Sequence, residues 1–115
     1  MASLFELQNP NFGQLTKTKV IKTENGAHVL TTAETIEGIV DGTPTGNRTI
    51  TTPTAAELLT ALGPQNKVGQ CFELTVVNKA ASTHKFTLTA GSDVTIVGEP
   101  DITADTSGTF IFRVT

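Results

Sequence analysis

The C-terminal half of the chain alternates apolar and polar residues with a period of two. The apolar residues of its four segments are Phe72, Leu74 and Val76; Phe86, Leu88 and Ala90; Val94 and Ile96; and Phe110, Phe112 and Val114. A period of two is typical of strands that bury one face. With turn-forming residues between the segments, the pattern predicts an antiparallel β-sandwich or a jelly-roll-like small barrel.

Composition supports a mostly β fold. The 115 residues include 22 Thr, 9 Val and 7 Ile, whose β-branched side chains pack well on pleated surfaces. Trp and Tyr are absent, so six Phe and the aliphatic residues must form the core. Such a core is modest, and chains of this kind often gain stability by oligomerising.

The first half of the chain predicts three further strands and a loop. Residues 16–22 alternate, and an Asn-Gly turn within residues 24–26 leads to residues 27–30, which together predict a hairpin. Residues 35–40 predict another strand. Residues 43–47 are rich in Thr, Gly, Pro and Asn and predict a loop.

One short helix is predicted over residues 54–62. Thr54 and Glu57 are three residues apart, the spacing of a capping box, in which each side chain accepts a hydrogen bond from the other residue's amide. Leu58, Leu59 and Leu62 form an apolar stripe that suits packing on a sheet. A Gly-Pro pair follows and ends the helix. The fold class is therefore all-β with one short helix.

The first 15 residues predict an extended N-terminal arm, followed by a single β-sandwich domain over residues 16–115. The arm sustains neither strand nor helix periodicity, yet it carries five large apolar residues, Leu4, Phe5, Leu7, Phe12 and Leu15. Such groups are costly in water. We expect them to dock either on their own domain or on a partner.

Charge and hydropathy argue against two classes of partner. The net charge is −3, so no basic field is present to bind nucleic acid through its phosphates. No apolar run approaches the roughly 20 residues of a membrane helix, and the N-terminus lacks a secretory signal pattern. We therefore expect a soluble protein that is not exported.

The sequence offers no convincing catalytic, metal or cofactor site. His28 and His84 lie outside any metal-ligand spacing and are expected to be solvated, and Cys71 is expected to be a buried structural thiol. Four carboxylates near the last predicted turns are expected to be solubilising groups: Asp93, Glu99, Asp101 and Asp105. A catalytic pair or a weak calcium site among them is the less favoured alternative. Without Trp or Tyr, the chain also lacks the aromatic platforms of stacking ligand sites.

Four segments of the second half are similar to a known class of proteins. They are TTPTAAELLTAL (51–62), VGQCFELTVVN (68–78), TLTAGSDVTIVG (87–98) and TSGTFIFRVT (106–115). Their succession resembles virion structural modules of tailed bacteriophages, in particular capsid decoration (cement) proteins and related head-fibre or tail-fibre domains. The resemblance covers about residues 50–115. It implies a non-enzymatic β-rich module that assembles as a homotrimer on the outside of a particle.

These arguments lead to one expected function and two alternatives. The expected function is a capsid decoration protein, made in the host cytoplasm and bound to the major capsid protein at the virion surface, with the arm on the shell or on an adjacent trimer. The first alternative is a fibre module that binds a host receptor or glycan through the loops 43–47 and 78–83. The second is a small hydrolase or metal-binding enzyme, which a cluster of His28, His84 and acidic side chains would support.

Overall fold

A computed structural model describes residues 20–36 and 38–115 of the chain. The predicted arm and its five apolar residues lie outside these ranges. Eight strands are described: β1 (Val20–Thr23), β2 (His28–Val29), β3 (Gly38–Gly42), β4 (Arg48–Thr51), β5 (Cys71–Asn78), β6 (Phe86–Thr89), β7 (Asp101–Ile102) and β8 (Thr106–Arg113). Helix α3 (Thr32–Ile36) follows β2, and helix α4 (Ala55–Leu62) follows β4 and continues into a 3₁₀ turn, Gly63–Gln65.

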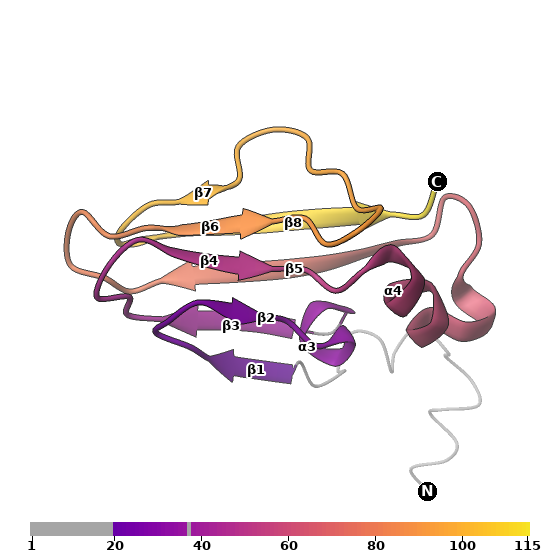
Figure 1. The fold of residues 1–115 in the computed structure, drawn as a ribbon, viewed down its shortest axis with the longest axis horizontal. Helices are drawn as coiled ribbons and strands as arrows, with labels where there is room; N and C mark the ends of the chain where they lie inside the picture. Colours follow the sequence, from indigo (N-terminus) through magenta and orange to yellow (C-terminus); the bar gives the residue numbers. More distant parts are fainter. Residues whose placement is uncertain (1–19, 37) are drawn as a thin grey trace, which may run out of the picture.

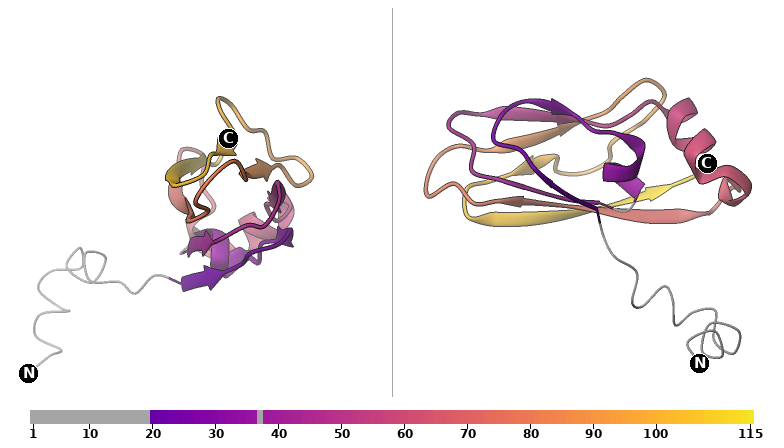
Figure 2. Two further views of the ribbon diagram at one scale, coloured as in Figure 1. Left: turned by 90° about the vertical axis from the view of Figure 1, so that its left-hand side faces the viewer. Right: turned by 90° about the horizontal axis from the view of Figure 1, so that it is seen from below.

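The strands form two four-stranded sheets that face each other. Sheet A has the order β1-β3-β5-β8, and sheet B has the order β2-β4-β6-β7. Up to β6 the chain alternates between the sheets, so that it winds as a coil whose turns stack side by side (Figure 1). Viewed along the strands, the two sheets surround a common interior (Figure 2, left). The predicted mostly β fold and the two-layer arrangement are therefore confirmed.

The expected antiparallel pairing is wrong for most of the structure. In sheet A, β1 pairs with β3 and β3 with β5 in parallel, and in sheet B, β2 pairs with β4 and β4 with β6 in parallel. Only β5 with β8 and β6 with β7 are antiparallel. Up to β6, each return to the same sheet follows a crossover through the other sheet, and such a connection gives parallel neighbours. This pairing differs from that of a jelly roll, which is antiparallel.

The predicted hairpin around the Asn-Gly turn is wrong for the same reason. The turn does connect two strands, but β1 belongs to sheet A and β2 to sheet B. Their hydrogen-bonded partners are therefore β3 and β4. Local turn chemistry predicted the change of direction correctly and the pairing incorrectly.

A second helix replaces the start of the strand predicted over residues 35–40. Helix α3 begins with a reciprocal capping box: the Thr31 amide donates to Glu34 Oε1 at 2.9 Å, and the Glu34 amide donates to Thr31 Oγ1 at 3.2 Å. Thr35 is fully buried. The backbone at Gly38 follows so closely that a Cβ there would lie 1.4 Å from the Glu34 carbonyl oxygen. The fold thus has two short helices, and only glycine fits where α3 meets β3.

The helix predicted over residues 54–62 is confirmed as α4, with Thr54 as its cap. The Thr54 amide donates to Glu57 Oε1 at 3.0 Å, and the Glu57 amide donates to Thr54 Oγ1 at 3.2 Å. Gly63 ends the helix with φ 57°, which a non-glycine residue adopts only with strain. Both helices lie on returns from sheet B to sheet A, at the same end of the sandwich (Figure 1).

The core lies between the two sheets. Its buried members come from both sheets and from the segment after β2: Leu30, Val40, Ile50, Leu74, Val76, Phe86, Leu88 and Ile102. The inward faces predicted for β5 and β6 are therefore confirmed. Residues 93–97 form no strand, although Val94 and Ile96 still alternate with the exposed Thr95 and Val97.

Asn78 connects the sheets at the end opposite the helices. Its buried amide nitrogen donates to the carbonyls of His84 and of Ile102 in β7, at 3.0 and 2.9 Å. Its side-chain oxygen accepts from the Ala80 amide at 2.9 Å. Because every polar atom of this side chain is paired, Asn78 links β5 of sheet A to sheet B without an unsatisfied buried group.

Candidate functional site

The two sheets differ in length at the end that carries the helices. Strands β5 and β8 are each eight residues long and pair along their whole length, whereas β6 has four residues and β7 has two. The start of β5 and the end of β8 therefore have no strand opposite them. Helix α4 and the loop between β6 and β7 enclose a cavity of about 620 Å³ there. We call this cavity the groove.

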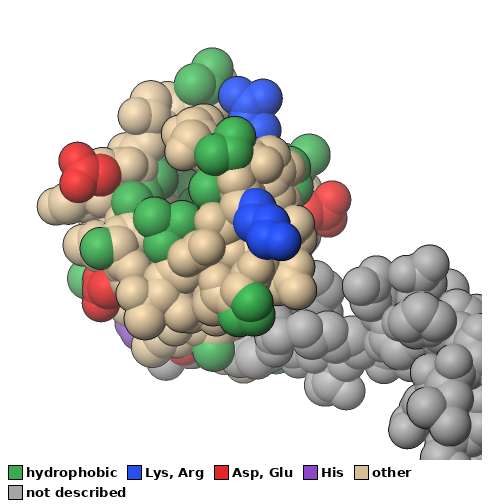
Figure 3. Space-filling model, turned by 90° about the vertical axis from the view of Figure 1, so that its right-hand side faces the viewer, with side chains coloured by type: hydrophobic (Ala, Val, Ile, Leu, Met, Phe, Trp, Pro, Cys, Tyr) green, Lys and Arg blue, Asp and Glu red, His purple; other side chains and the backbone are tan. Residues whose placement is uncertain are grey.

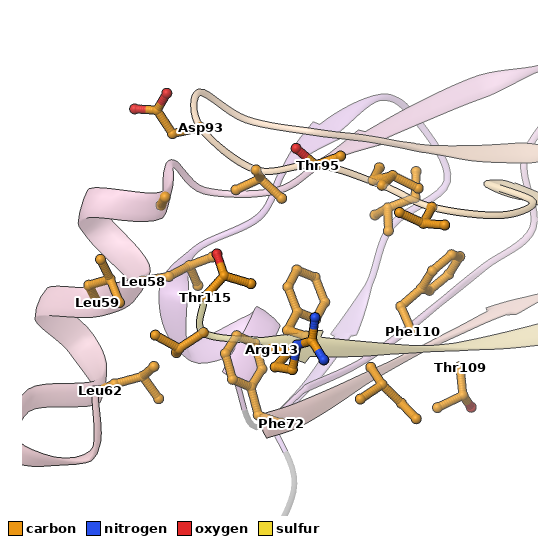
Figure 4. Close-up of a pocket in the computed structure, with 18 of the residues that line it drawn as sticks. Leu58, Leu59, Leu62, Phe72, Asp93, Thr95, Thr109, Phe110, Arg113 and Thr115 are labelled. Carbon is orange, nitrogen blue, oxygen red and sulfur yellow. The ribbon is translucent and has the colours of Figure 1, made fainter. Parts of the chain in front are cut away.

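Apolar side chains form most of the groove. They come from α4, β5, β6, the loop 93–97 and the β8 segment: Ala55, Leu58, Leu59, Leu62, Phe72, Leu88, Val94, Ile96, Val97, Phe110, Ile111, Phe112 and Val114. Figure 3 looks at this end of the molecule and shows hydrophobic side chains around a hollow. In Figure 4 Leu58 and Leu62 of α4 point toward Phe72 and the β8 segment across the cavity.

Polar groups lie at the rim. Asp93, Thr95, Glu99, Thr109, Arg113 and Thr115 complete the lining. The side chain of Asp93 points away from the cavity (Figure 4), and its backbone has a positive φ of 63°. Glu99 Oε1 accepts a hydrogen bond from the Asp101 amide at 3.0 Å. The groove therefore combines apolar walls with polar surface in similar measure, which suits a peptide segment that carries apolar side chains together with polar backbone groups.

Sequence reasoning placed the groove residues in the core and missed their exposure. The apolar stripe of α4 and the alternation of β5 and β8 were predicted correctly, yet Leu59 of that stripe is 36% exposed. The sequence does predict strands of unequal length. Predicting a groove from this difference also requires knowing which strands face each other.

His28 is half-buried between two carboxylates, and the expectation that it is solvated was wrong. Its Nε2 lies 3.0 Å from Glu34 Oε1, and its Nδ1 lies 3.7 Å from Glu24 Oε2. Partial burial raises the pKa of Glu34, but hydrogen bonds from Thr31 and the neighbouring His28 outweigh it, so the pKa lies below its usual value. Strand β2, helix α3 and the turn after β1 thus meet at one polar cluster.

In the described part of the chain, His28 and His84 do not join acidic side chains in a metal-binding group of the kind that would support the enzyme alternative. Within residues 20–36 and 38–115, no group of three or more His, Cys, Asp or Glu side chains is arranged to hold a metal ion. His84 lies in the turn before β6, where its carbonyl accepts from Asn78.

Asp101 accepts hydrogen bonds from two side chains, one in strand β6 and one in the residue before that strand. Lys85 Nζ donates to its Oδ2 at 2.6 Å and Thr87 Oγ1 to its Oδ1 at 2.7 Å. The hydrogen bond from Lys85, followed by that from Thr87, lowers the pKa of Asp101, and Asp101 in turn raises the pKa of Lys85. This carboxylate connects strands β6 and β7 at the surface of sheet B.

Cys71 is exposed, and the prediction of a buried thiol was wrong. It is the first residue of β5, and it precedes the inward-facing Phe72, so alternation turns it outward. Its Sγ donates to the Gly69 carbonyl at 3.4 Å.

The loops predicted for receptor binding lie close together at the end of the sandwich opposite the groove. The Lys85 amide donates to Asn47 Oδ1 at 3.1 Å, which joins the loop after β3 to the turn before β6. Lys79 Nζ lies 3.1 Å from Asp41 Oδ2, and the Thr43 amide donates to Asn25 Oδ1 at 2.8 Å. These contacts therefore bring the turn after β1, the loop after β3 and the turn before β6 together at the end of the sandwich opposite the helices (Figure 1).

Comparison of the chain with protein-family models, with curated proteins and with solved structures finds no match. Among the described residues, none of the helices has the length and apolar character needed to cross a membrane.

Proposed function

We propose that the chain is a non-enzymatic structural protein of a tailed-phage particle, a capsid decoration protein that forms a homotrimer on the outside of the capsid. The observation that carries the proposal is the apolar groove of about 620 Å³, together with the exposed apolar residues around it. Contiguous exposed apolar surface on a small domain marks sites of protein contact. The resemblance of residues 50–115 to decoration proteins and related fibre domains supplies the kind of assembly.

The proposed mechanism is multivalent stapling of the capsid. Each copy contributes its N-terminal arm, with Leu4, Phe5, Leu7, Phe12 and Leu15, to the major capsid protein or to an adjacent trimer. Linked contacts of this kind act at high effective concentration, so weak individual contacts give strong attachment. The shell is thereby stabilised against internal pressure.

Two measurements test the proposal. Light scattering of the purified full chain should give three times the mass of one chain. The protein should co-sediment with heads assembled from the major capsid protein of the same genome, and deletion of residues 1–15 should abolish co-sedimentation while leaving the oligomer intact. A monomer that does not bind such heads would overturn the proposal. Binding at full affinity without the arm would overturn the role of the arm.

A second candidate is a fibre module that binds a host receptor or glycan. The observation in its favour is the contact between the loops at the end opposite the groove, where Asn47 and Lys85 join two of them. The side chains and backbone amides that make these contacts are polar, and such groups can also form hydrogen bonds with glycan hydroxyls. A glycan array and a host-cell binding assay with the full chain separate the two functions, because a decoration protein should bind neither.

A further inference from the structure

We propose that the groove is the docking site for residues 4–15 of the same molecule. The groove has room for several side chains, since its volume of about 620 Å³ is many times the roughly 30 Å³ that one water occupies in the liquid. This inference concerns the free protein and does not rest on the proposed function.

The described part of the chain begins near the end of the sandwich where the groove lies. Val20 pairs with Gly38 of β3, and the following residue of β3 pairs with Thr75 of β5. Val20 therefore lies level with Leu74, whose partner in β8 is Phe110, a residue of the groove. Because β1 runs parallel to β5, the chain before Val20 enters from the end where α4 and the groove lie.

The segment is long enough to reach the groove. Three strand spacings of about 4.8 Å, or about 14 Å in all, separate β1 from β8 across sheet A. Leu15 is five residues before Val20 and Leu4 is sixteen residues before it. At about 3.4 Å per residue these stretches span up to about 17 and 55 Å. Every apolar residue of the arm is therefore within range of the groove.

The chemistry of the segment matches that of the groove. Besides Met1, residues 1–15 contain five large apolar side chains, and Glu6 is their single charged side chain. The groove offers apolar walls from α4 and β8, among them Leu59, which is 36% exposed, and the half-buried Phe110. Docking would remove apolar groups of both partners from water. A tethered segment also has an effective concentration in the millimolar range, which favours its own groove over that of another molecule.

A photo-crosslinking experiment with the full chain locates the segment. Benzoylphenylalanine takes the place of Phe12, and the crosslinked peptide is identified by mass spectrometry after irradiation. We expect crosslinks to α4, to residues 93–97 or to residues 109–115, within single molecules and with a yield that does not change on dilution. Absence of crosslinks, crosslinks elsewhere on the domain, or crosslinks between molecules that disappear on dilution would each overturn the proposal.

A pair of variants provides the matched comparison. Leu59→Glu places a carboxylate on the groove wall at a partly exposed position, and Val68→Glu makes the same change at a residue that is 82% exposed and outside the groove lining. We expect Leu59→Glu to lower the crosslinking yield at least about tenfold, because an unpaired charge would enter an apolar contact. Val68→Glu should leave the yield unchanged. Equal yields in the two variants would contradict docking in the groove.

Two further measurements distinguish a loss of docking from a loss of the fold and from a failure of the proposed function. Wild-type far-UV circular dichroism and a cooperative urea transition in both variants show that the domain is intact, so that a lost crosslink reports docking. Sedimentation with phage heads tests the proposed function separately, because a protein that binds heads without the intramolecular crosslink refutes the docking and leaves the proposed function standing.

Discussion

The rings of Phe72 and Phe112 are stacked, with centroids 4.8 Å apart and an angle of 8° between their planes. The two residues are direct partners in the antiparallel pair of β5 and β8. They lie where sheet A extends beyond sheet B, so their stack forms part of the groove rather than the closed core. This pair of rings therefore joins β5 to β8 at this end of sheet A and also forms part of the proposed docking surface.

Replacing one ring of this stack should destabilise the domain. Phe112→Ala removes a half-buried ring together with its stacking contact with Phe72. We expect a loss of about 2 kcal/mol in the free energy of unfolding. Ile111→Ala, at the neighbouring residue that is 69% exposed, should cost less than about 1 kcal/mol. Urea unfolding of both variants measures the difference. Similar losses in the two variants would show that the stack contributes little.

The link between the sheets at Asn78 should be sensitive to truncation. Asn78→Ala leaves the carbonyls of His84 and Ile102 and the amide of Ala80 without this partner, and we expect a loss of about 3 kcal/mol in the free energy of unfolding. Asn66→Ala is the matched control, because Asn66 is exposed and its side-chain nitrogen donates to the Leu59 carbonyl at 3.3 Å. Denaturant unfolding should show less than about 1 kcal/mol for the control. If the two substitutions cost the same, the buried link is unimportant.

The capping box of α4 should contribute measurably to stability. Thr54→Ala removes the acceptor of the Glu57 amide, and we expect a loss of about 1 kcal/mol. Thr60→Ala, at an exposed position inside the same helix, should be neutral or slightly stabilising because alanine favours helix. The midpoint of thermal unfolding distinguishes the two. A neutral Thr54→Ala would mean that tertiary contacts alone hold the helix.

Stability should fall when the pH is lowered below about 4.5, the ordinary pKa of a glutamate side chain. The pKa of Glu34 is lowered in the folded state, so the unfolded chain binds its proton at a higher pH than the folded chain does. The stabilisation from this group is therefore complete above about 4.5 and is lost as the pH falls through the lowered value. The hydrogen bond from Thr23, followed by that from Lys79, lowers the pKa of Asp41 in the same direction.

Thermal unfolding across this pH range measures the effect. Glu34→Gln should be less stable than the wild type at neutral pH, and its stability should depend less steeply on pH. Glu73→Gln, at an exposed position of β5, controls for the loss of one negative charge. A wild-type slope in Glu34→Gln would show that other carboxylates account for the acid sensitivity.

Gly42 should tolerate no side chain. A Cβ at this position would lie 1.9 Å from the Glu24 carbonyl oxygen and 3.0 Å from the ring of Phe86. We expect Gly42→Ala to cost about 3 kcal/mol or to prevent folding, because a backbone atom must move. At Gly46 the nearest atoms belong to the flexible side chain of Arg48, at 3.3 Å, so Gly46→Ala should be tolerated. Soluble yield and unfolding midpoints of both variants test this difference.

Local patterns in the sequence predicted which residues face inward and where one helix lies. The alternation of β5 placed Leu74 and Val76 in the core, and the spacing of Thr54 and Glu57 predicted the capping box of α4. The same spacing, between Thr31 and Glu34, marks the start of α3, whose end overlaps the strand predicted over residues 35–40. Alternation also contradicted the expectation of a buried Cys71. These features depend on neighbours close in sequence, so the sequence by itself determined them.

Only the tertiary structure decided how the strands pair and where the His28 cluster and the groove form. Alternation is the same in parallel and antiparallel strands, so it could not show that β1, β3 and β5 run in one direction. The environment of His28 depends on a turn, a strand and a helix that meet in space. The groove depends on a long strand pair facing a shorter sheet. Each of these features joins residues that are distant in the chain, and no local period records which of them meet.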